Sequence, residues 1–306
     1  MLRRRSSRRV SMPINALLIV LVSAVMHAGW NLLMRGSGGP MRFARRMLWA
    51  VTAITIVPVI IFEFTRTPLG WPVWGIGVGS GVCCGLYYFG LGRAYRSTDF
   101  TIAYPVARAL PVIAIGVIDM FLNEPPKPLG WLGMLLVVIG CVLVPLESWR
   151  AFHLHRYLNR ASIWIGLTAL GTVGYSLLDD RAASRMESLH IQGFEGGLRY
   201  SAVFFMFAAV SLELLLRVTR TRPNPGPNPK WSHIAPAAIL VYVAYALIVW
   251  VYQMVEQVSY VVAFRQFSIV IGVVAAFLLF HEAGRAIRIF ASVLLTIGLM
   301  VISLWG

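Results

Sequence analysis

Two arginines lie inside long apolar stretches of the chain, where a charged side chain needs a partner or water. Arg108 lies about nine residues into the stretch 99–122, and Arg265 about seven residues into the stretch 258–280. At about 1.5 Å per helical residue, both would lie roughly 10 to 14 Å deep in a membrane. An unpaired guanidinium at that depth costs at least about 2.5 to 3.5 kcal/mol. Each arginine is therefore expected either to bind an anionic group of a substrate, such as a carboxylate or phosphate, or to pair with an internal aspartate.

Three aspartates are candidates for such internal ion pairs. Asp119 is the fourth residue from the end of its apolar stretch, where it could snorkel, form hydrogen bonds or take up a proton. Asp179 and Asp180 end the predicted helix 162–180 beside Arg181, which favours a solvated helix end over a proton relay. Asp119 is accordingly our candidate for ion coupling.

A polar stripe in the first apolar stretch adds hydrogen-bonding groups. His27, Trp30 and Asn31 are three and four residues apart, so they share one helix face. Polar groups this deep point into the bundle, either as contacts between helices or as the lining of a cavity. Aromatic walls around the apolar part of a substrate could come from Tyr87, Tyr88, Tyr104, Tyr175, Tyr245 and Trp250, and amides would hydrogen-bond to it. The predicted substrate-binding residues are His27, Trp30, Asn31, Tyr104, Arg108, Tyr175, Arg265 and Gln266.

The elements that must position these residues are transmembrane helices. Of the 306 residues 58% are hydrophobic and 13% charged, and the mean hydropathy is +0.74. Soluble domains are about 45 to 50% apolar and 25% charged, which excludes a soluble enzyme or a disordered chain. A membrane span needs about 20 apolar residues. Ten such segments are predicted, at 13–34, 47–65, 71–91, 99–122, 129–146, 162–180, 196–216, 234–255, 258–280 and 286–305.

The ten segments divide into two halves of five. A basic tail at 1–12 precedes the first repeat, 13–146, and a hydrophilic loop at 147–161 separates it from the second repeat, 162–306. Because each half has an odd number of spans, the second half must enter the membrane in the opposite orientation. An alignment at constant offset places Asn123–Glu124 on His281–Glu282, which supports a duplication only weakly.

Prolines and glycines predict local features of the helices. Pro105 and Pro111 lie six residues apart in the segment 99–122, where they would produce either a broken helix or a harmless kink. Glycines make the segment 71–91 unusually thin and favour close helix packing. They stand at positions 75, 77, 79, 81 and 85.

The net charge of +15 is mainly a signal of topology. Of 27 basic residues, fifteen fall in the odd-numbered loops and five on the opposite side, which predicts cytoplasmic odd loops and external termini. Five arginines before Met12 contradict this orientation, and one hypothesis is that translation starts at Met12. The first apolar run lacks a cleavage pattern and is expected to be a retained span.

The order and spacing of several motifs resemble a known family. The residues are His27-Ala-Gly-Trp-Asn31 with Arg35, Tyr87-Tyr88, Ala103-Tyr104-Pro105 with Arg108 and Pro111, Glu124, Tyr175, Asp180-Arg181-Ala182, Arg265-Gln266-Phe267-Ser268 and Glu282. Together they resemble the EamA-like ten-helix transporters of the drug/metabolite transporter superfamily over nearly the whole chain. The resemblance implies two inverted five-helix repeats around a central cavity, alternating access, and export or exchange of small metabolites. A lysine is common in that family where this chain has Arg35.

The expected function is secondary active transport of a small polar or zwitterionic metabolite that carries an anionic group. No cofactor, metal site or nucleic-acid partner is expected, and the chain is expected to be a monomer or homodimer in a bacterial inner membrane. The two alternatives are a membrane-embedded enzyme and a scaffold protein that transports nothing. The sequence has no metalloprotease or nucleophile-elbow motif, and a scaffold has little use for buried arginines.

Overall fold

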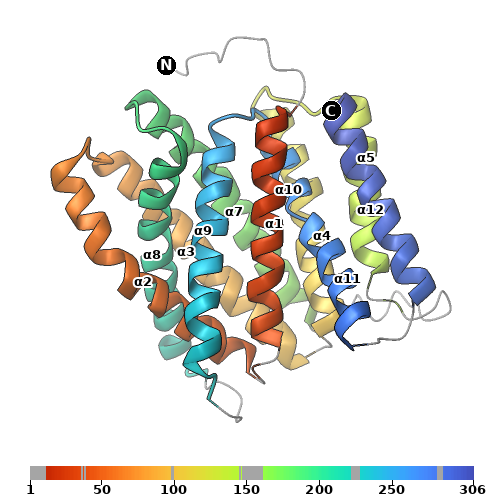
Figure 1. Cartoon of the computed structure of the whole chain (residues 1–306), viewed down its shortest axis with the longest axis horizontal. Helices are drawn as coiled ribbons and strands as arrows, with labels where there is room; N and C mark the ends of the chain where they lie inside the picture. The colour runs from red at the N-terminus through yellow and green to blue at the C-terminus, as the bar shows by residue number, and fades with distance from the viewer. Residues whose placement is uncertain are drawn as a thin grey trace.

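The computed structural model describes residues 12–35, 37, 39–97, 100–144, 146, 161–221, 228–280 and 285–306. The tail 1–11, nearly all of the predicted loop 147–161 and the side chains of Arg35, Tyr104 and Glu282 lie outside this description. The described part is helical and contains no strand (Figure 1). Its helices are α1 (Ile14–Arg35), α2 (Pro40–Thr65), α3 (Gly70–Ser97), α4 (Phe100–Phe121), α5 (Pro128–Leu143), α7 (Ala161–Ser188), α8 (Gly193–Val218), α9 (Trp231–Tyr252), α10 (Val258–Phe264), α11 (Phe267–Phe280) and α12 (Arg285–Trp305).

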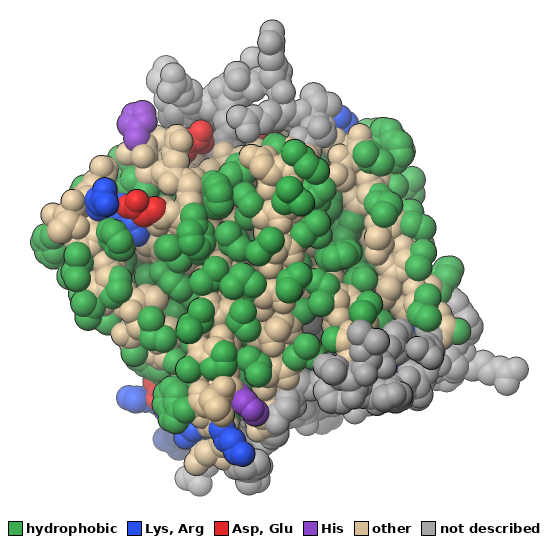
Figure 2. Space-filling view, in the orientation of Figure 1, with side chains coloured by type: hydrophobic (Ala, Val, Ile, Leu, Met, Phe, Trp, Pro, Cys, Tyr) green, Lys and Arg blue, Asp and Glu red, His purple; other side chains and the backbone are tan. Residues whose placement is uncertain are grey.

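The surface of the bundle is that of an integral membrane protein. Within the described residues, seven segments are helical, long and apolar enough to cross a membrane, and α5 is a shorter apolar helix. Large apolar side chains at Ile14, Leu18, Val22 and Val25 are all more than half exposed, so α1 presents an apolar stripe outward. Figure 2 shows hydrophobic side chains across the middle of the visible face and charged ones near its ends. The predicted class, an all-α multi-pass membrane protein, is confirmed.

Two predicted helix boundaries are wrong in ways that affect the site. Helix α2 begins at Pro40, so it includes arginines that the sequence analysis assigned to the preceding loop. Helix α7 continues to Ser188 instead of ending at Asp180. Asp179 is therefore not at a solvated helix end, and its side chain is buried. The polar sequence after Asp180 continues the helix because it has no glycine or proline to stop it.

The break in a helix occurs in a different segment from the one that the prolines suggested. Helix α4 is continuous through Pro105 and Pro111. The segment 258–280 instead divides into α10 and α11 at Arg265 and Gln266, without a proline. A proline removes one backbone hydrogen bond, which a membrane helix tolerates. The break at Arg265 is stabilised by side chains that bind the carbonyl groups there, as described below.

Close helix packing is confirmed at Gly77, Gly81 and Gly85 of α3, whereas Gly75 has no neighbour within 4 Å. A Cβ atom added at Gly81 would lie 2.7 Å from the carbonyl oxygen of Phe204 in α8. The absence of a side chain at Gly81 thus lets the two backbones approach each other. This packing brings one face of α3 against α8 and another against α7, where the polar residues of the site lie.

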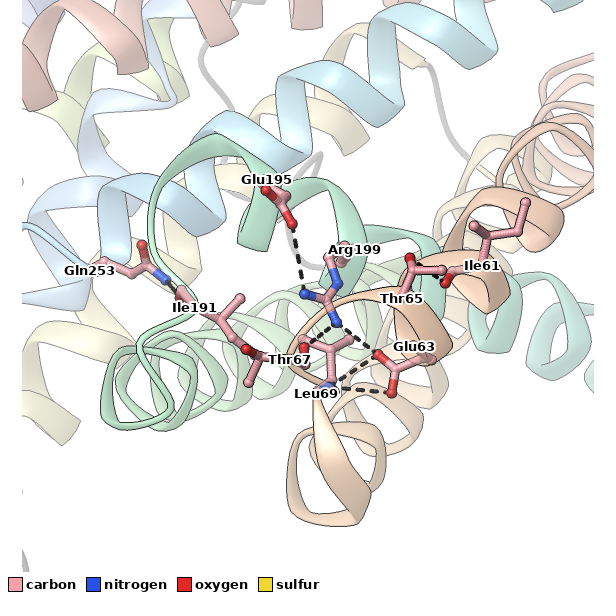
Figure 3. A network of polar contacts seen from close by, with 9 residues as sticks. All are labelled: Ile61, Glu63, Thr65, Thr67, Leu69, Ile191, Glu195, Arg199 and Gln253. Carbon is pink, nitrogen blue, oxygen red and sulfur yellow. Dashed lines mark hydrogen bonds and ion pairs between the residues drawn. The ribbon is translucent and has the colours of Figure 1, made fainter.

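Ion pairs join α2 and α8 at both ends. Arg199, near the start of α8, donates to Glu63 (3.2 Å) and to the carbonyl of Thr67 (2.7 Å), as Figure 3 shows. Arg45, near the start of α2, forms two hydrogen bonds with Glu213, at 2.6 and 2.9 Å. The two helices are therefore antiparallel. The start of α1 and the end of α12 lie at the same end of the bundle (Figure 1). Arg199 and Glu63 lie at this end as well. At the opposite end α2 starts and α8 ends, and we call it the arginine-rich end.

Candidate functional site

A small cavity lies within the bundle, and aromatic side chains form most of its wall. Its volume is about 30 Å³, whereas pockets for drug-sized molecules measure about 300 to 1,000 Å³. In this conformation it therefore accommodates only water-sized molecules. The lining residues are Ser23, His27, Trp30, Cys84, Tyr87, Tyr88, Tyr175, Phe204, Phe205, Val241, Ala244, Tyr245, Ile248 and Arg265.

Arg265 supplies the positive charge of the cavity. It caps the C-terminus of α10, at the break before α11. Its guanidinium lies 5.8 Å from the centre of the Tyr175 ring and 5.9 Å from that of Tyr245. Within the described part of the chain, this guanidinium donates no hydrogen bond and forms no ion pair. Contacts with aromatic faces stabilise a cation but leave its N–H groups available for an anion.

Arg108 lies behind the cavity wall and is held in place by its neighbours. Its Nε donates to Oε1 of Gln266 (2.8 Å), its Nη1 contacts Nε2 of His27 (2.7 Å), and its Nη2 donates to the carbonyl of Arg265 (2.9 Å). Gln266 in turn donates through Nε2 to the carbonyls of Arg108 (3.2 Å) and Val262 (3.0 Å). These bonds satisfy carbonyl groups at the helix break and fix the backbone that carries Arg265.

His27 connects Arg108 to the cavity. Nε1 of Trp30 lies 3.2 Å from Nδ1 of His27, so N–H donors face both ring nitrogens. A neutral imidazole has one acceptor nitrogen. The shorter contact, from Arg108, assigns that role to Nε2, and Trp30 instead packs its edge against the ring at a centroid distance of 5.0 Å. Asn31 donates to the carbonyl of His27 (2.7 Å), and its Oδ1 has no hydrogen-bond partner among the described residues.

Asp179 forms a second polar cluster next to the cavity. Its Oδ1 accepts hydrogen bonds from Ser80 (2.5 Å) and Tyr200 (2.8 Å), and its Oδ2 accepts one from Tyr245. Three different helices, α3, α8 and α9, thus donate hydroxyl groups to one carboxylate of α7. Tyr245 is part of both the Asp179 cluster and the cavity wall, because its ring lines the cavity and faces Arg265.

Asp119 lies at the other end of α10 and outside the cavity lining. Its Oδ2 accepts a hydrogen bond from the backbone N–H of Ser259 (3.0 Å), in the first turn of α10. The side chain is fully buried, and its Oδ1 has no partner among the described residues. A carboxylate at a helix N-terminus satisfies a free N–H group and interacts favourably with the helix dipole. In this geometry Asp119 caps α10.

The structure brings together most of the residues predicted for the site. His27, Trp30, Tyr175 and Arg265 line the cavity. Behind them, Arg108, Gln266 and Asn31 bind one another or His27, while the side chain of Tyr104 lies outside the described residues. Sequence analysis named Tyr87, Tyr88 and Tyr245 only as general candidates for aromatic walls. It missed Cys84, Phe204 and Phe205, because an apolar residue in a membrane helix carries no sequence signal for a cavity.

Comparisons with known proteins agree with the expected family. The model of the EamA-like transporter family matches residues 14–146, nearly all of the first predicted repeat, and thus supports the resemblance for that part of the chain. A solved structure described only as the crystal structure of a protein is similar over 95% of this chain and 97% of its own, with a TM-score of 0.68 and 20% sequence identity. That similarity shows a shared fold. No curated protein matches the chain.

Proposed function

We propose that this chain, whose residues 14–146 match the EamA-like transporter family, is a secondary active transporter that exports or exchanges a small polar or zwitterionic metabolite. The metabolite carries an anionic group, such as a carboxylate or phosphate. The transporter works by alternating access, without a cofactor, as a monomer or homodimer.

The observation that carries this proposal is the environment of Arg265. A buried guanidinium is stable only when it is paired or solvated. Arg265 faces a cavity, and its guanidinium has no hydrogen-bonding or anionic partner among the described residues. A substrate anion would supply that partner through the planar fork of N–H groups. The rings of Tyr175 and Tyr245 would then enclose the apolar part of the substrate.

Arg108 has a different role in this proposal. Its three donor groups are already bound to Gln266, His27 and the carbonyl of Arg265. We therefore assign it to positioning Arg265 at the helix break, whereas the sequence analysis expected both arginines to bind the anion. Asn31 and Gln266 remain candidates for hydrogen bonds to a substrate when the helices move apart.

Several contacts support an arrangement of ten spans in two inverted repeats, with α10 and α11 together forming one span. Arg108 and Gln266 are 158 positions apart and bind each other, and the same offset aligns Asn123–Glu124 with His281–Glu282. Two equivalent residues touch only near a two-fold axis. Helices at equivalent positions also pack together, α2 on α8, α4 on α10 and α5 on α12.

The ion pairs of α2 and α8 fit the same symmetry. Each of these helices has an arginine near its start and a glutamate near its end, and each arginine pairs with the glutamate of the other helix. This reciprocal pattern is expected when the second repeat, 162–306, is inverted relative to the first, 13–146.

The small volume of the cavity supports a conformational cycle. Since about 30 Å³ is too little for a metabolite, the helices around Arg265 must separate to admit one. Movement of one repeat against the other would open the site to each side of the membrane in turn. The arginine-rich end would face the cytoplasm of a bacterial inner membrane, in accordance with the positive-inside rule.

Counterflow in proteoliposomes tests the proposed function. Vesicles are loaded with a pool of unlabelled amino acids, nucleosides and organic acids, and uptake of the labelled pool is followed. We expect wild-type protein to accumulate label and Arg265→Ala to accumulate none above protein-free vesicles. If no solute of the pool moves with wild-type protein, the alternatives of a scaffold or a membrane-embedded enzyme gain support. If Arg265→Ala transports normally, the anion site is wrong.

A further inference from the structure

A buried carboxylate outside the proposed anion site accepts three hydrogen bonds from described residues, and all three come from hydroxyl groups. Asp179 is 1% exposed and lies nine residues before the end of α7. Its three partners are the hydroxyl groups of Ser80, Tyr200 and Tyr245. A cluster that joins four helices can serve to pack them together. The hydroxyl groups and the position next to the cavity also suit proton transfer.

Hydroxyl partners suit a carboxylate that gains and loses a proton. An ionised carboxylate only accepts hydrogen bonds, whereas a protonated one must also donate one. A hydroxyl group can donate or accept, so the cluster around Asp179 can satisfy both protonation states by rotating hydrogens. The backbone N–H that binds Asp119 can only donate, so that contact cannot accept the proton of a protonated carboxyl group. Of the two aspartates, Asp179 is therefore better adapted to proton binding.

Tyr245 connects Asp179 to the cavity. Its hydroxyl donates to Oδ2 of Asp179, and its ring lines the cavity beside the Arg265 guanidinium. Tyr175, one helical turn before Asp179 in α7, faces the same guanidinium. The negative charge of Asp179 and the positive charge of Arg265 are thus separated by a single layer of aromatic side chains.

We propose that Asp179 is the proton-coupling group of this transporter, and that it takes up a proton when an anionic group binds to Arg265. Arg265 and Asp179 carry opposite charges on either side of Tyr245, so the positive field of Arg265 acts on the carboxylate. A bound anion neutralises that field, so proton uptake by Asp179 becomes more favourable. By linkage, protonation of Asp179 favours anion binding by the same factor. Solute and proton then move in the same direction, so the outward gradient of the metabolite drives export and carries a proton out with it.

The proton reaches Asp179 through Tyr245. Cavity water in contact with bulk water donates a proton to the Tyr245 oxygen, and the original hydroxyl proton passes to Oδ2 of Asp179. Tyr245 is unchanged at the end, the carboxylate has become a carboxylic acid, and the aqueous phase has lost one proton. Release to the other side reverses these steps.

Several other ionisable groups lie around Asp179. Those that interact with its charge are Cys83 and Cys84 of α3, Tyr200 of α8, Tyr245 and Tyr252 of α9, and Arg265 at the helix break. From α4, Arg108 faces His27 and Gln266. Asp180 follows Asp179 on α7. Among these groups, Asp179 is the carboxylate bound to a residue of the cavity wall.

The experiment measures proton and solute movement together, because this inference rests on the proposed function. Proteoliposomes contain the pH-sensitive dye pyranine, and the same pool of amino acids, nucleosides and organic acids is added outside without a pH gradient. We expect wild-type protein to acidify the lumen as labelled pool enters. For Asp179→Asn, we expect the ratio of protons to labelled solute to fall at least about tenfold, since an amide has no carboxylate to protonate.

Two tyrosine variants form a matched pair, and their results hold even if Asp179→Asn fails to fold. Tyr245→Phe and Tyr200→Phe each remove one hydroxyl donor from Asp179, but only Tyr245 lines the cavity. We expect Tyr245→Phe to lower the ratio of protons to solute and Tyr200→Phe to leave it unchanged. Equal ratios in wild type and Tyr245→Phe would overturn the relay, and an undiminished ratio in Asp179→Asn would overturn the coupling role.

The same experiment separates failure of this inference from failure of the proposed function. Wild-type counterflow without solute-dependent acidification would overturn proton coupling and leave the transporter and its anion site intact. Absence of wild-type counterflow would overturn both.

Discussion

Replacing each of the two buried arginines by alanine should change the stability of the protein differently. Arg108 forms hydrogen bonds within the fold, whereas the guanidinium of Arg265 is proposed to bind a ligand. Arg108→Ala removes one donor of the Arg265 carbonyl, which keeps its hydrogen bond from Ser268 Oγ, at a cost of about 0.5 to 1.5 kcal/mol. It also leaves two acceptors without the guanidinium donor, namely Gln266 Oε1 and His27 Nε2. Each such acceptor costs about 1 to 3 kcal/mol, and removal of a buried charge returns about 2.5 to 3.5 kcal/mol. The net expectation is a loss of about 0 to 5 kcal/mol of unfolding free energy.

Arg265→Ala removes no hydrogen bond of the guanidinium to any residue that the structure describes. It removes two contacts with aromatic rings, worth about 0.5 to 2 kcal/mol each. Relief of the buried charge, about 2.5 to 3.5 kcal/mol, offsets this loss. The variant should therefore be about as stable as wild type or more stable, yet inactive in counterflow.

Reversible unfolding of the detergent-solubilised protein in SDS mixed micelles measures both free energies. Lysine variants at both positions separate the effect of charge from that of hydrogen bonding, because lysine supplies the charge but cannot bridge three acceptors. Arg265→Lys should keep part of the counterflow activity, and Arg108→Lys should unfold almost as easily as Arg108→Ala. The reasoning is refuted if Arg265→Ala is destabilised as much as Arg108→Ala.

Three further variants test the packing and the charges around the site. Gly81→Val, whose Cβ would lie 2.7 Å from a carbonyl oxygen of α8, should lose about 1 to 3 kcal/mol of stability. Gly75→Val is the control and should lose none, because a Cβ there has no neighbour within 4 Å. Equal losses in the two variants would contradict the packing. A double-mutant cycle of Glu63 and Arg199, whose side chains are 17% and 2% exposed, should give a coupling energy of about 0.5 to 3 kcal/mol in the same unfolding assay, and a value of zero would show that the pair is not formed. Asp119→Asn should lose about 0.5 to 2 kcal/mol as a weakened cap and keep solute-driven acidification, whereas loss of acidification would return the coupling role to Asp119.

The sequence predicts the class of this protein well because lipid imposes a strong and local constraint. A long apolar run without charge has few alternatives to a membrane helix, so the class and most segments follow directly. Helix boundaries near polar residues are predicted less accurately. The predicted positions of the start of α2 and the end of α7 were wrong, because arginines and aspartates can lie inside a helix when another helix supplies their partners.

The site is predictable only to the level of residue type. Burial of Arg108 and Arg265 is evident from their position in apolar segments. Whether the guanidinium of each arginine is hydrogen-bonded depends on His27, which lies in α1, and on Gln266, which lies at the break between α10 and α11. The role of Asp179 depends in the same way on Tyr200 and Tyr245, residues 21 and 66 positions away. Contacts of this kind are properties of packing and leave no trace in the spacing of residues along one helix.

The most direct test of the anion site compares charged and neutral competitors in counterflow. Unlabelled amino acids are added outside the vesicles in excess over the labelled pool, and in a parallel sample they are replaced by their methyl esters, which lack the carboxylate charge. If Arg265 binds the anionic group, the acids should inhibit wild-type counterflow much more strongly than the esters, and Arg265→Lys should keep part of that preference. Equal inhibition of the wild-type protein by acids and esters would contradict the central claim.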